Sequence, residues 1–242
     1  MTRPWFPFAS EAHDRADVAL LTLPYAGGSS LAVRNWQAAL GGRVQVLAAE
    51  LPGRGTRLRE APLEDPEQVL GSLLPELDAR RAGRPLGIFG HSLGAFLAFD
   101  IARAVVPEPV VCVVSGARPP DVPPKGPRLH ELDDEGFVQA LENLGGTPRA
   151  VLEDRELFEL FLPALRADLR MAERFERPST EKIAAPLRVL CGDRDEYVDS
   201  ETMRGWSRFA GGSCSIHVVP GGHFFPTENE GEVLRLLAEA LV

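Results

Sequence analysis

The segment PLGIFGHSLGAFLAFDIARAV, residues 85–105, decides the fold of this chain. Its first part, residues 85–89, is apolar and predicts a short buried strand, and residues 95–105 predict a helix. Between them lies GHSLG, residues 90–94, a G-x-S-x-G run that presents a nucleophilic serine on a tight strand-to-helix turn. The two glycines leave room for neighbouring backbone that a Cβ would strike. We therefore predict that Ser92 is a catalytic nucleophile.

Strand-like and helix-like segments alternate along the rest of the chain. The predicted strands are residues 18–23, 44–51, 85–89, 110–115, 187–191 and 214–219. The predicted helices are residues 33–40, 66–81 with Asp65 as N-cap, 95–105, and 227–242 with Thr227 and Glu230 at capping-box spacing. This alternation predicts a mostly parallel central sheet flanked by helices, in one domain over residues 1–242. Together with the G-x-S-x-G turn, it indicates an α/β-hydrolase fold.

One region, about residues 119–184, breaks the alternation because it contains no convincing strand. Five prolines at its start, residues 119–127, make the entry rigid and non-helical. Residues 133–144 and 153–176 then have the pattern of amphipathic helices. We expect a helical lid insertion over the serine; the alternative is an ordinary long crossover between two strands.

The net charge of −9 over 242 residues argues against nucleic acid or an anionic membrane as a partner. An acidic partner would need a local basic patch, for which Arg54, Arg57 and Arg59 are candidates; ordinary solvated arginines are the alternative. No apolar stretch reaches the length of a membrane span.

The cysteines and the N-terminus bear on the compartment. The chain has three cysteines, an odd number, and no C-x-x-C motif. Each lies in an apolar run: Cys112, Cys191 and Cys214. We expect buried, reduced thiols of a cytoplasmic protein rather than a disulfide or metal ligands. The first ten residues lack the continuous apolar region of a signal peptide, which favours the same location.

A serine nucleophile needs a base, which is a histidine, and an acid that orients it, in the chain order serine, acid, histidine. The candidate bases are His13, His91, His130, His217 and His223. His223 lies in PGGHFF, directly after the last predicted strand, where glycines allow close approach and Phe224 and Phe225 can pack the ring. We predict His223 as the base, and we expect His91 to point away from the active face of Ser92.

The acid is expected in the loop GDRDE, residues 192–196, which follows a late strand. Asp195 and Asp193 are both candidates, with Asp199 a weaker one. We favour Asp195, because Asp193 directly follows the strand-end glycine and is well placed to hold the loop by a local turn.

An oxyanion hole requires two backbone N–H donors. We predict Leu93, the residue after the nucleophile, and Ala26, in the loop PYAGG of residues 24–28. A phosphate-binding turn is the alternative for this loop, but it lacks the Walker lysine and the G-x-G-x-x-G spacing.

Several segments together resemble the type II thioesterases of polyketide and non-ribosomal peptide assembly lines. They are LPYAGGSS (23–30), ELPGRGTR (50–57), GHSLGAFLAFDIAR (90–103), ELFELFLPALRADLRMAERF (156–175) with its LP-x-LRAD signature, GDRDEYV (192–198) and GGHFF (221–225). The resemblance covers roughly residues 18–235 and is far more specific than G-x-S-x-G alone.

The resemblance implies Ser92 as nucleophile, Asp195 as acid, His223 as base, and the backbone of Ala26 and Leu93 as oxyanion hole. It implies hydrolysis, through an acyl-serine, of stalled or wrong acyl thioesters on the 4′-phosphopantetheine arm of an acyl or peptidyl carrier protein. A monomer without metal or cofactor of its own is expected.

Two residues depart from the family pattern: Tyr25 replaces a histidine, and Phe175 replaces a tyrosine. Neither is in the expected triad, and both bear on pocket shape and acyl preference. Two other functions stay open: a fatty acyl thioesterase or other serine esterase of the same fold, and a non-catalytic carrier-binding module. The complete set of expected triad residues argues against the module.

Overall fold

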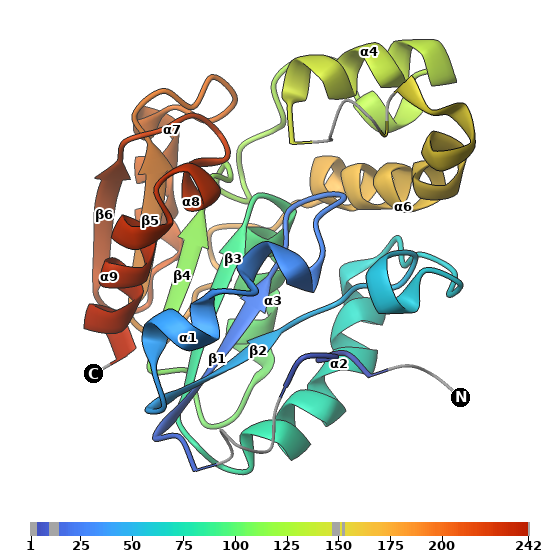
Figure 1. Cartoon of the computed structure of the whole chain (residues 1–242). Coiled ribbons are helices and arrows are strands. Elements are labelled where there is room, and N and C mark those ends of the chain that lie inside the picture. The colour runs from blue at the N-terminus through green and yellow to red at the C-terminus, as the bar shows by residue number, and fades with distance from the viewer. Residues whose placement is uncertain (1–3, 10–14, 147–150, 152, 242) are drawn as a thin grey trace.

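Six strands form one sheet in the computed structural model of this chain, which describes residues 4–9, 15–146, 151 and 153–241 (Figure 1). The strands are β1 (Val18–Leu23), β2 (Val44–Ala48), β3 (Leu86–His91), β4 (Val111–Ser115), β5 (Leu187–Gly192) and β6 (Cys214–Val219). Their order is β2-β1-β3-β4-β5-β6, and each neighbouring pair is parallel. The predicted α/β fold is therefore confirmed, with strand ends within three residues of those expected.

Strands β1 to β5 are almost entirely buried because helices cover both faces of the sheet, whereas the edge strand β6 is mostly exposed or half-buried. The α-helices are α1 (Trp36–Leu40), α2 (Pro66–Arg81), α3 (Leu93–Ala104), α4 (Asp134–Leu144), α6 (Arg155–Arg174), α7 (Ser200–Arg204), α8 (Phe225–Glu228) and α9 (Glu230–Leu241). Short 3-10 helices are η2 (Ser30–Val33), η3 (Gly55–Arg57), η4 (Leu129–Glu131) and η5 (Gly205–Phe209). The predicted helix 33–40 is thus a 3-10 turn followed by a short α-helix.

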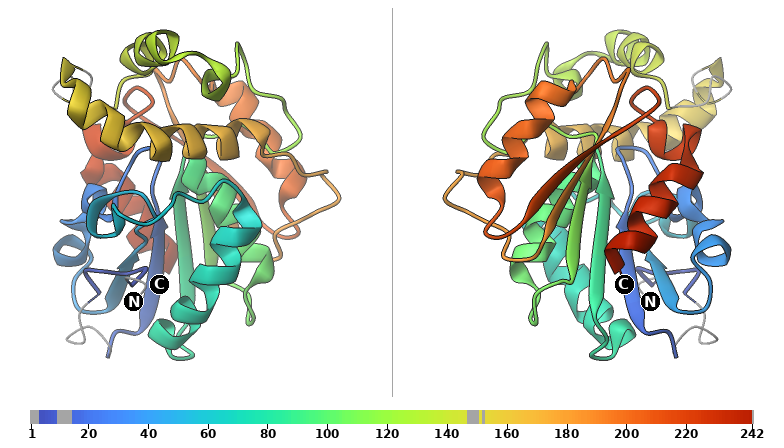
Figure 2. Two further views of the ribbon diagram at one scale, coloured as in Figure 1. Left: turned by 90° about the vertical axis from the view of Figure 1, so that its right-hand side faces the viewer. Right: turned by 90° about the vertical axis from the view of Figure 1, so that its left-hand side faces the viewer.

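Two buried clusters hold the helices to the sheet. On one face, α1 and α9 pack against the strands through residues such as Trp36, Phe89 and Leu237. On the other face, α2, α3 and η5 contribute a second cluster that includes Phe99 and Trp206. Figure 2 shows α2 and α9 on opposite sides of the sheet. The nucleophile strand β3 therefore lies in the middle of the molecule, covered on both faces.

The predicted closing helix 227–242 is divided, and its capping box is wrong. Asn229, with φ −128° and ψ 48°, lies between α8 and α9. Thr227 is inside α8, because Pro226 at the first turn already starts a helix there. Thr227 therefore does not cap the helix that contains Glu230.

The burial of each cysteine depends on the position of its strand in the sheet. Cys112 and Cys191 are buried, and all three cysteines are free thiols. Cys214 is only half-buried, contrary to the expectation, because β6 is the edge strand of the sheet.

Residues 116–186, called here the inserted segment, connect β4 to β5, and their helices α4 and α6 lie above the carboxyl ends of the strands (Figures 1 and 2). Their described part contains η4, α4 and α6 and no strand of the sheet. Asp133 caps α4 by accepting from the N–H of Gly136 at 2.8 Å, and Asp154 caps α6 by accepting from the N–H of Leu157 at 3.0 Å. The helices thus begin within two residues of the predicted positions.

The longer helix of the inserted segment, α6, has two unlike halves separated by Pro163. The half before Pro163 is largely exposed, and Leu160 there is 49% exposed. The half after it is mostly buried and includes Leu165 and Asp168. Proline has no backbone N–H to donate within the helix, and its ring disfavours a straight helix through that position. The two halves still share one apolar cluster, in which Phe158 of the first half packs with Leu165 and Leu169 of the second.

Candidate active site

Ser92 occupies the sharp turn between β3 and α3. Its φ is +55° and its ψ is −116°, a left-handed conformation that non-glycine residues rarely adopt. The Ser92 N–H donates to the carbonyl oxygen of Ser115 at 2.8 Å, which anchors the turn to β4. A Cβ on Gly90 would overlap the backbone of Gly94, and one on Gly94 would overlap the carbonyl of Leu23. The glycine spacing is required sterically, as the sequence predicts.

His223 and Asp195 are in direct contact. Their Nδ1 and Oδ2 atoms are 2.9 Å apart, and the Asp195 side chain is fully buried. The other oxygen of Asp195 accepts from the N–H groups of Tyr197 at 2.9 Å and Val198 at 3.1 Å. An ionised carboxylate only accepts hydrogen bonds, so His223 carries its proton on Nδ1. Nε2 is then left as an acceptor, which is the state that a general base needs.

The two other aspartates of this region are engaged elsewhere. Asp193 accepts from the N–H of Gly221 at 2.8 Å and so holds the loop that carries His223. Asp199 caps α7 by accepting from the N–H of Thr202 at 2.7 Å, and it pairs with Lys125 at 2.9 Å. Only Asp195 of the three candidates contacts the His223 ring.

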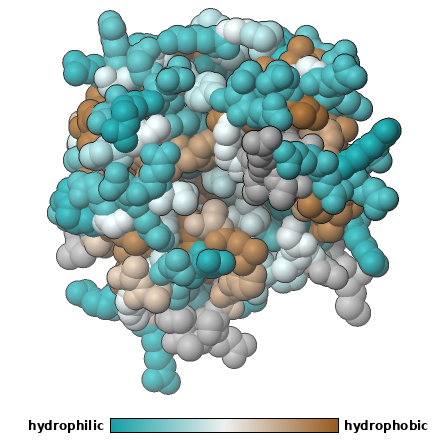
Figure 3. Space-filling model, turned by 45° about the horizontal axis from the view of Figure 1, so that its top comes forward, coloured by the Kyte–Doolittle hydropathy of each residue, from teal (hydrophilic) through white to brown (hydrophobic). Residues whose placement is uncertain are grey.

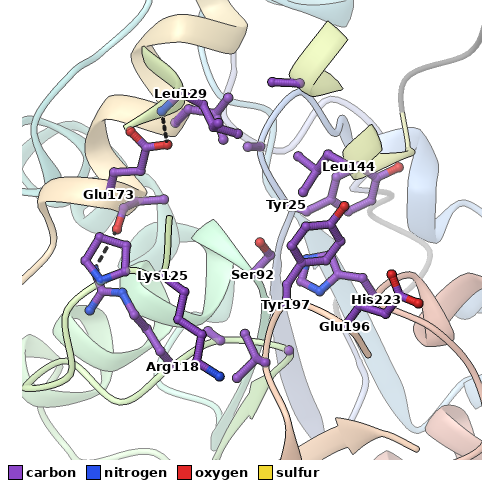
Figure 4. Close-up of a pocket in the computed structure, with 18 of the residues that line it drawn as sticks. Tyr25, Ser92, Arg118, Lys125, Leu129, Leu144, Glu173, Glu196, Tyr197 and His223 are labelled. Atoms are coloured by element: carbon purple, nitrogen blue, oxygen red, sulfur yellow. Dashed lines mark hydrogen bonds between the residues drawn. The ribbon is translucent and has the colours of Figure 1, made fainter. Parts of the chain in front are cut away.

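Ser92 and His223 line the same cavity (Figure 4). Within the described residues the Oγ of Ser92 has no hydrogen-bond partner. Catalytic hydrogen bonds are often long without substrate and shorten in the complex. The arrangement therefore places a base and a nucleophile in one cavity with the Ser92 hydroxyl unengaged.

The loop opposite Ser92 is a tight turn. The N–H of Gly28 donates to the carbonyl of Tyr25 at 2.8 Å, and Gly27 has a φ of +75°. Ala26 lies at the second position of this turn and lines the cavity. Neither its N–H nor that of Leu93, the first residue of α3, has an acceptor in the described part of the chain. Both predicted oxyanion donors are thus unoccupied.

The arginines proposed as a basic surface patch do not form one. Arg54 and Arg57 have side chains that are 4% and 6% exposed. Arg54 pairs with Asp168, and Arg57 pairs with Glu60 at 2.7 Å. Arg59 alone of the three is exposed. The patch prediction is wrong because the loop folds its arginines inward onto acidic partners.

Asp168 is a residue to which the sequence reasoning assigned no role. It is fully buried in α6 and contacts both Arg54 and the loop of Ala26. A signal was present: Asp168 stands in an otherwise apolar stripe with Ala164, Leu165 and Met171. A carboxylate on the buried face of a helix is rare unless it is paired. That pattern could have marked Asp168 as having a specific partner.

His91 does not line the cavity of Ser92, but its ring lies beside that of His223. The two ring centroids are 5.1 Å apart, and Nδ1 of His91 is 3.0 Å from the hydroxyl oxygen of Ser115. Strand alternation gives His91 the same face as Phe89, which is the face that the His223 loop covers. Burial lowers the pKa of His91 well below its usual range, so the ring is neutral.

The other described histidines also lie outside the cavity lining. His130 in η4 contacts Glu173 of α6. His217 on β6 is 3.0 Å from the hydroxyl of Ser215. His13 lies outside the described residues. Neither His130 nor His217 contacts Ser92, Asp195 or His223.

The cavity has a volume of about 590 Å³ and a mostly apolar wall. The apolar lining includes Phe96, Val122, Leu129, Leu132, Leu144 and Leu169. Charged residues in the lining are Arg118, Lys125, Glu173 and Glu196 (Figure 4). The inserted segment supplies much of this wall, and its outer face is largely hydrophilic with small apolar patches (Figure 3). The arrangement suits an apolar chain that ends at Ser92.

Arg118 contributes to the wall rather than to a free cationic site. Its guanidinium donates to the carbonyls of Ala172 at 3.1 Å and Phe175 at 2.9 Å. It also lies over the ring of Phe96, 5.0 Å from the centroid. Burial lowers the pKa of Arg118 to about 10. Arg118 thereby ties the start of the inserted segment to the end of α6.

The two departures from the family pattern differ in their positions. Tyr25 lines the cavity, and its ring is 5.1 Å from that of Phe224. Phe175 is not in the lining but stacks on Phe96, with centroids 4.7 Å apart. Tyr25 therefore affects the cavity directly, and Phe175 affects it through Phe96.

The described residues contain no group of three or more histidine, cysteine, aspartate or glutamate side chains that could hold a metal ion. No described helix has the length and apolar character to cross a bilayer.

Comparison with known proteins gives one consistent picture. A family model of the thioesterase domain matches residues 19–241. The gramicidin S biosynthesis protein GrsT of Aneurinibacillus migulanus is 31% identical over 241 residues, covering 98% of this chain and 93% of GrsT.

Solved structures agree. RedJ, a thioesterase from the prodiginine biosynthetic pathway in Streptomyces coelicolor, aligns with a TM-score of 0.85 at 32% identity, over 98% of this chain and 92% of RedJ. The type II thioesterase BorB from the borrelidin biosynthetic cluster aligns with a TM-score of 0.83 at 37% identity, over 99% of this chain and 96% of BorB.

Proposed function

The chain belongs to the thioesterase family, whose domain model spans residues 19–241, and we propose that it is a type II editing thioesterase. It removes stalled or wrong acyl groups from the phosphopantetheine arm of acyl or peptidyl carrier proteins in polyketide or non-ribosomal peptide biosynthesis. The biosynthetic roles printed in the names of GrsT, RedJ and BorB support this assignment.

In the acylation step, Nε2 of His223 takes the proton of the Ser92 hydroxyl as Oγ attacks the thioester carbonyl. The oxyanion of the tetrahedral intermediate accepts hydrogen bonds from the N–H groups of Ala26 and Leu93. Asp195 stabilises the imidazolium through Nδ1. The intermediate collapses, the C–S bond breaks, and His223 protonates the departing thiolate.

In the deacylation step, neutral His223 takes a proton from a water molecule that attacks the acyl-serine. The same two N–H groups stabilise the second oxyanion. Collapse breaks the bond to Oγ, His223 returns the proton to Ser92, and the carboxylic acid leaves. The enzyme is regenerated without a redox step.

The inserted segment acts in this proposal as a lid, because it covers the carboxyl ends of the strands and supplies much of the apolar lining. The acyl chain occupies the cavity of about 590 Å³. The carrier protein remains outside, and its arm delivers the thioester to Ser92.

The enzyme works in this proposal as a cytoplasmic monomer, and it needs no cofactor of its own because its substrate carries the phosphopantetheine arm. Three free thiols, at Cys112, Cys191 and Cys214, fit a reducing compartment.

The observation that carries the proposal is the contact of His223 with buried Asp195 in the cavity that Ser92 lines. The test compares wild type with Ser92→Ala on acyl thioesters of a carrier protein. We expect hydrolysis to fall by at least about 10³-fold while the unfolding midpoint stays unchanged. Ser72→Ala, on the exposed face of α2, is the matched control and keeps full activity.

A substrate panel then separates this function from its alternatives. The same acyl groups are offered on carrier protein, on coenzyme A and as simple esters. Preference for carrier-bound acyl groups supports editing, whereas preference for simple esters indicates a general esterase. Carrier binding without hydrolysis of any substrate would indicate a non-catalytic module and would overturn the proposal.

A further inference from the structure

The carboxylate of Asp168 joins three separate parts of the chain. Asp168 lies on α6 of the inserted segment with a fully buried side chain. Its Oδ2 accepts from the N–H of Gly27 at 2.7 Å and from Nη1 of Arg54. Its Oδ1 accepts from Nη2 of Arg54 at 2.8 Å. A bidentate arginine–carboxylate pair is geometrically well defined, so the position of Oδ2 at Gly27 is well defined too.

Arg54 is itself held from the other side. Its Nη2 donates to the carbonyl of Pro52 at 3.2 Å, and its Nη1 is 3.4 Å from the carbonyl of Gly28. The guanidinium therefore contacts both its own loop and the turn that contains Ala26. Both ends of the ion pair act on the same turn.

The contacts leave one N–H of this turn available. The Gly28 N–H is bonded within the turn, and the Gly27 N–H is bonded to Asp168. The N–H of Ala26 has no acceptor in the described part of the chain. Gly27 has a φ of +75°, the conformation that type II turns require at their third position. A hydrogen bond to the Gly27 N–H restricts rotation of the peptide unit that follows Ala26.

Packing reinforces the hydrogen bond. A Cβ on Gly27 would overlap the side chain of Leu165, one turn before Asp168 on α6. The turn is thus in contact with α6 through both a hydrogen bond and a van der Waals surface. These contacts come from the buried half of α6, after Pro163.

We propose that Asp168 and Arg54 are positioning residues that hold the Ala26 N–H in the oxyanion hole. The inference rests on the proposed function, since it assigns these residues to the same reaction. Asp168 supplies the acceptor that orients the turn. Arg54 neutralises its charge, because an unpaired carboxylate next to this turn would oppose the developing oxyanion. The inserted segment thereby takes part in transition-state stabilisation as well as in enclosing the acyl chain.

The experiment measures kcat and KM separately on one acyl thioester for wild type, Asp168→Asn and Arg54→Lys. It also measures affinity for a trifluoromethyl ketone analogue of the acyl group, whose Ser92 adduct places an oxyanion in the hole. A side-chain amide has one oxygen, so in Asp168→Asn the NH₂ group faces a donor in either orientation, Nη2 of Arg54 or the N–H of Gly27, and the bidentate pair is lost. We expect Asp168→Asn to lower kcat and analogue affinity together by about 10- to 100-fold with little change in KM.

The matched control is Asp100→Asn. Asp100 forms a largely buried pair with Arg177 at 2.7 Å, remote from the cavity lining. We expect it to lower the unfolding midpoint but to leave kcat and analogue affinity unchanged. A merely structural role of Asp168 would give this same pattern.

The inference is overturned if folded Asp168→Asn keeps kcat and analogue affinity within about twofold of wild type, a difference too small for a displaced oxyanion donor. If Asp168→Asn yields no folded protein, Arg54→Lys decides by the same criterion. Lysine keeps the positive charge but cannot form the bidentate pair with Asp168. Loss of activity in Ser92→Ala alongside an unaffected Asp168→Asn refutes only this inference. Retained activity in Ser92→Ala refutes the proposed function.

Discussion

Asp195→Asn is the substitution for which the structure makes the sharpest prediction. One oxygen of Asp195 accepts from the backbone N–H groups of Tyr197 and Val198, and the other faces Nδ1 of His223. Asparagine has only one acceptor oxygen. Two backbone donors on one side hold that oxygen there, so the NH₂ group of the new side chain faces His223.

The consequence falls on the tautomer of His223. An NH₂ group facing Nδ1 requires Nδ1 to accept, so the ring proton moves to Nε2. A protonated Nε2 cannot take the proton of Ser92. In a serine protease the equivalent substitution lowers kcat about 10⁴-fold by forming this wrong tautomer, which corresponds to about 5 kcal/mol. We expect a loss of the same order, about 10³- to 10⁴-fold.

The assay measures kcat/KM for thiol release from an acyl thioester of N-acetylcysteamine, alongside the thermal unfolding midpoint. Asp193→Asn is the control: its side-chain oxygen can still accept from the Gly221 N–H, so we expect activity within about tenfold of wild type. If folded Asp195→Asn kept more than about a hundredth of wild-type activity, or if Asp193→Asn lost as much, the reasoning would be refuted.

Three further substitutions test the framework around the site. Gly94→Ala places a Cβ against the backbone carbonyl of Leu23. We expect the free energy of unfolding in urea to fall by about 3 kcal/mol or more, and an unchanged value would contradict the close approach. Phe175→Ala removes a buried ring stacked on Phe96, which costs about 3–5 kcal/mol in the same assay; a loss below about 1 kcal/mol, the cost of a surface change, would count against the stacking. Burial lowers the pKa of His91 below its usual 6.5, so the unfolded chain binds that proton first as pH falls. Stability should therefore decline below pH 6.5, by up to about 1.4 kcal/mol per pH unit, and less steeply in His91→Asn; equal slopes would contradict a buried neutral ring.

The sequence predicted the elements whose signals are local. Strands β1 to β5 are mostly apolar, buried runs because helices cover both faces of the sheet, and the structure places all six strands within three residues of their expected ends. The turn at Ser92 also has a local signal, the G-x-S-x-G spacing, because the backbone of Gly94 leaves no room for a Cβ on Gly90. The order of the late loops puts Asp195 after β5 and His223 after β6, and the sequence already favours Asp195; the structure adds the contact of Asp195 with His223, which Asp193 does not make.

Features that depend on distant partners could not be predicted in this way. Arg54 and Asp168 are 114 residues apart, and nothing near Arg54 indicates that its loop folds inward. The contact of His91 with His223 depends on which face of the sheet the His223 loop covers, and that loop is far from His91 in the sequence. The break at Asn229 follows from Pro226 starting α8 early, a competition between two possible helix starts. Each of these features depends on a contact between distant residues or on competing helix starts, and hydrophobic periodicity reports neither.

The position of Asp168 limits how the inserted segment can be exchanged between relatives. A chimera that replaced all of residues 116–186 to change acyl preference would also replace the partner of Arg54 and the side chain that packs on Gly27. The natural junction is Pro163, because the exposed half of α6 before it makes neither contact. A swap that ends there alters the cavity wall but keeps the contacts of Asp168 with Arg54 and of Leu165 with Gly27, so we expect acyl selectivity to change more than rate.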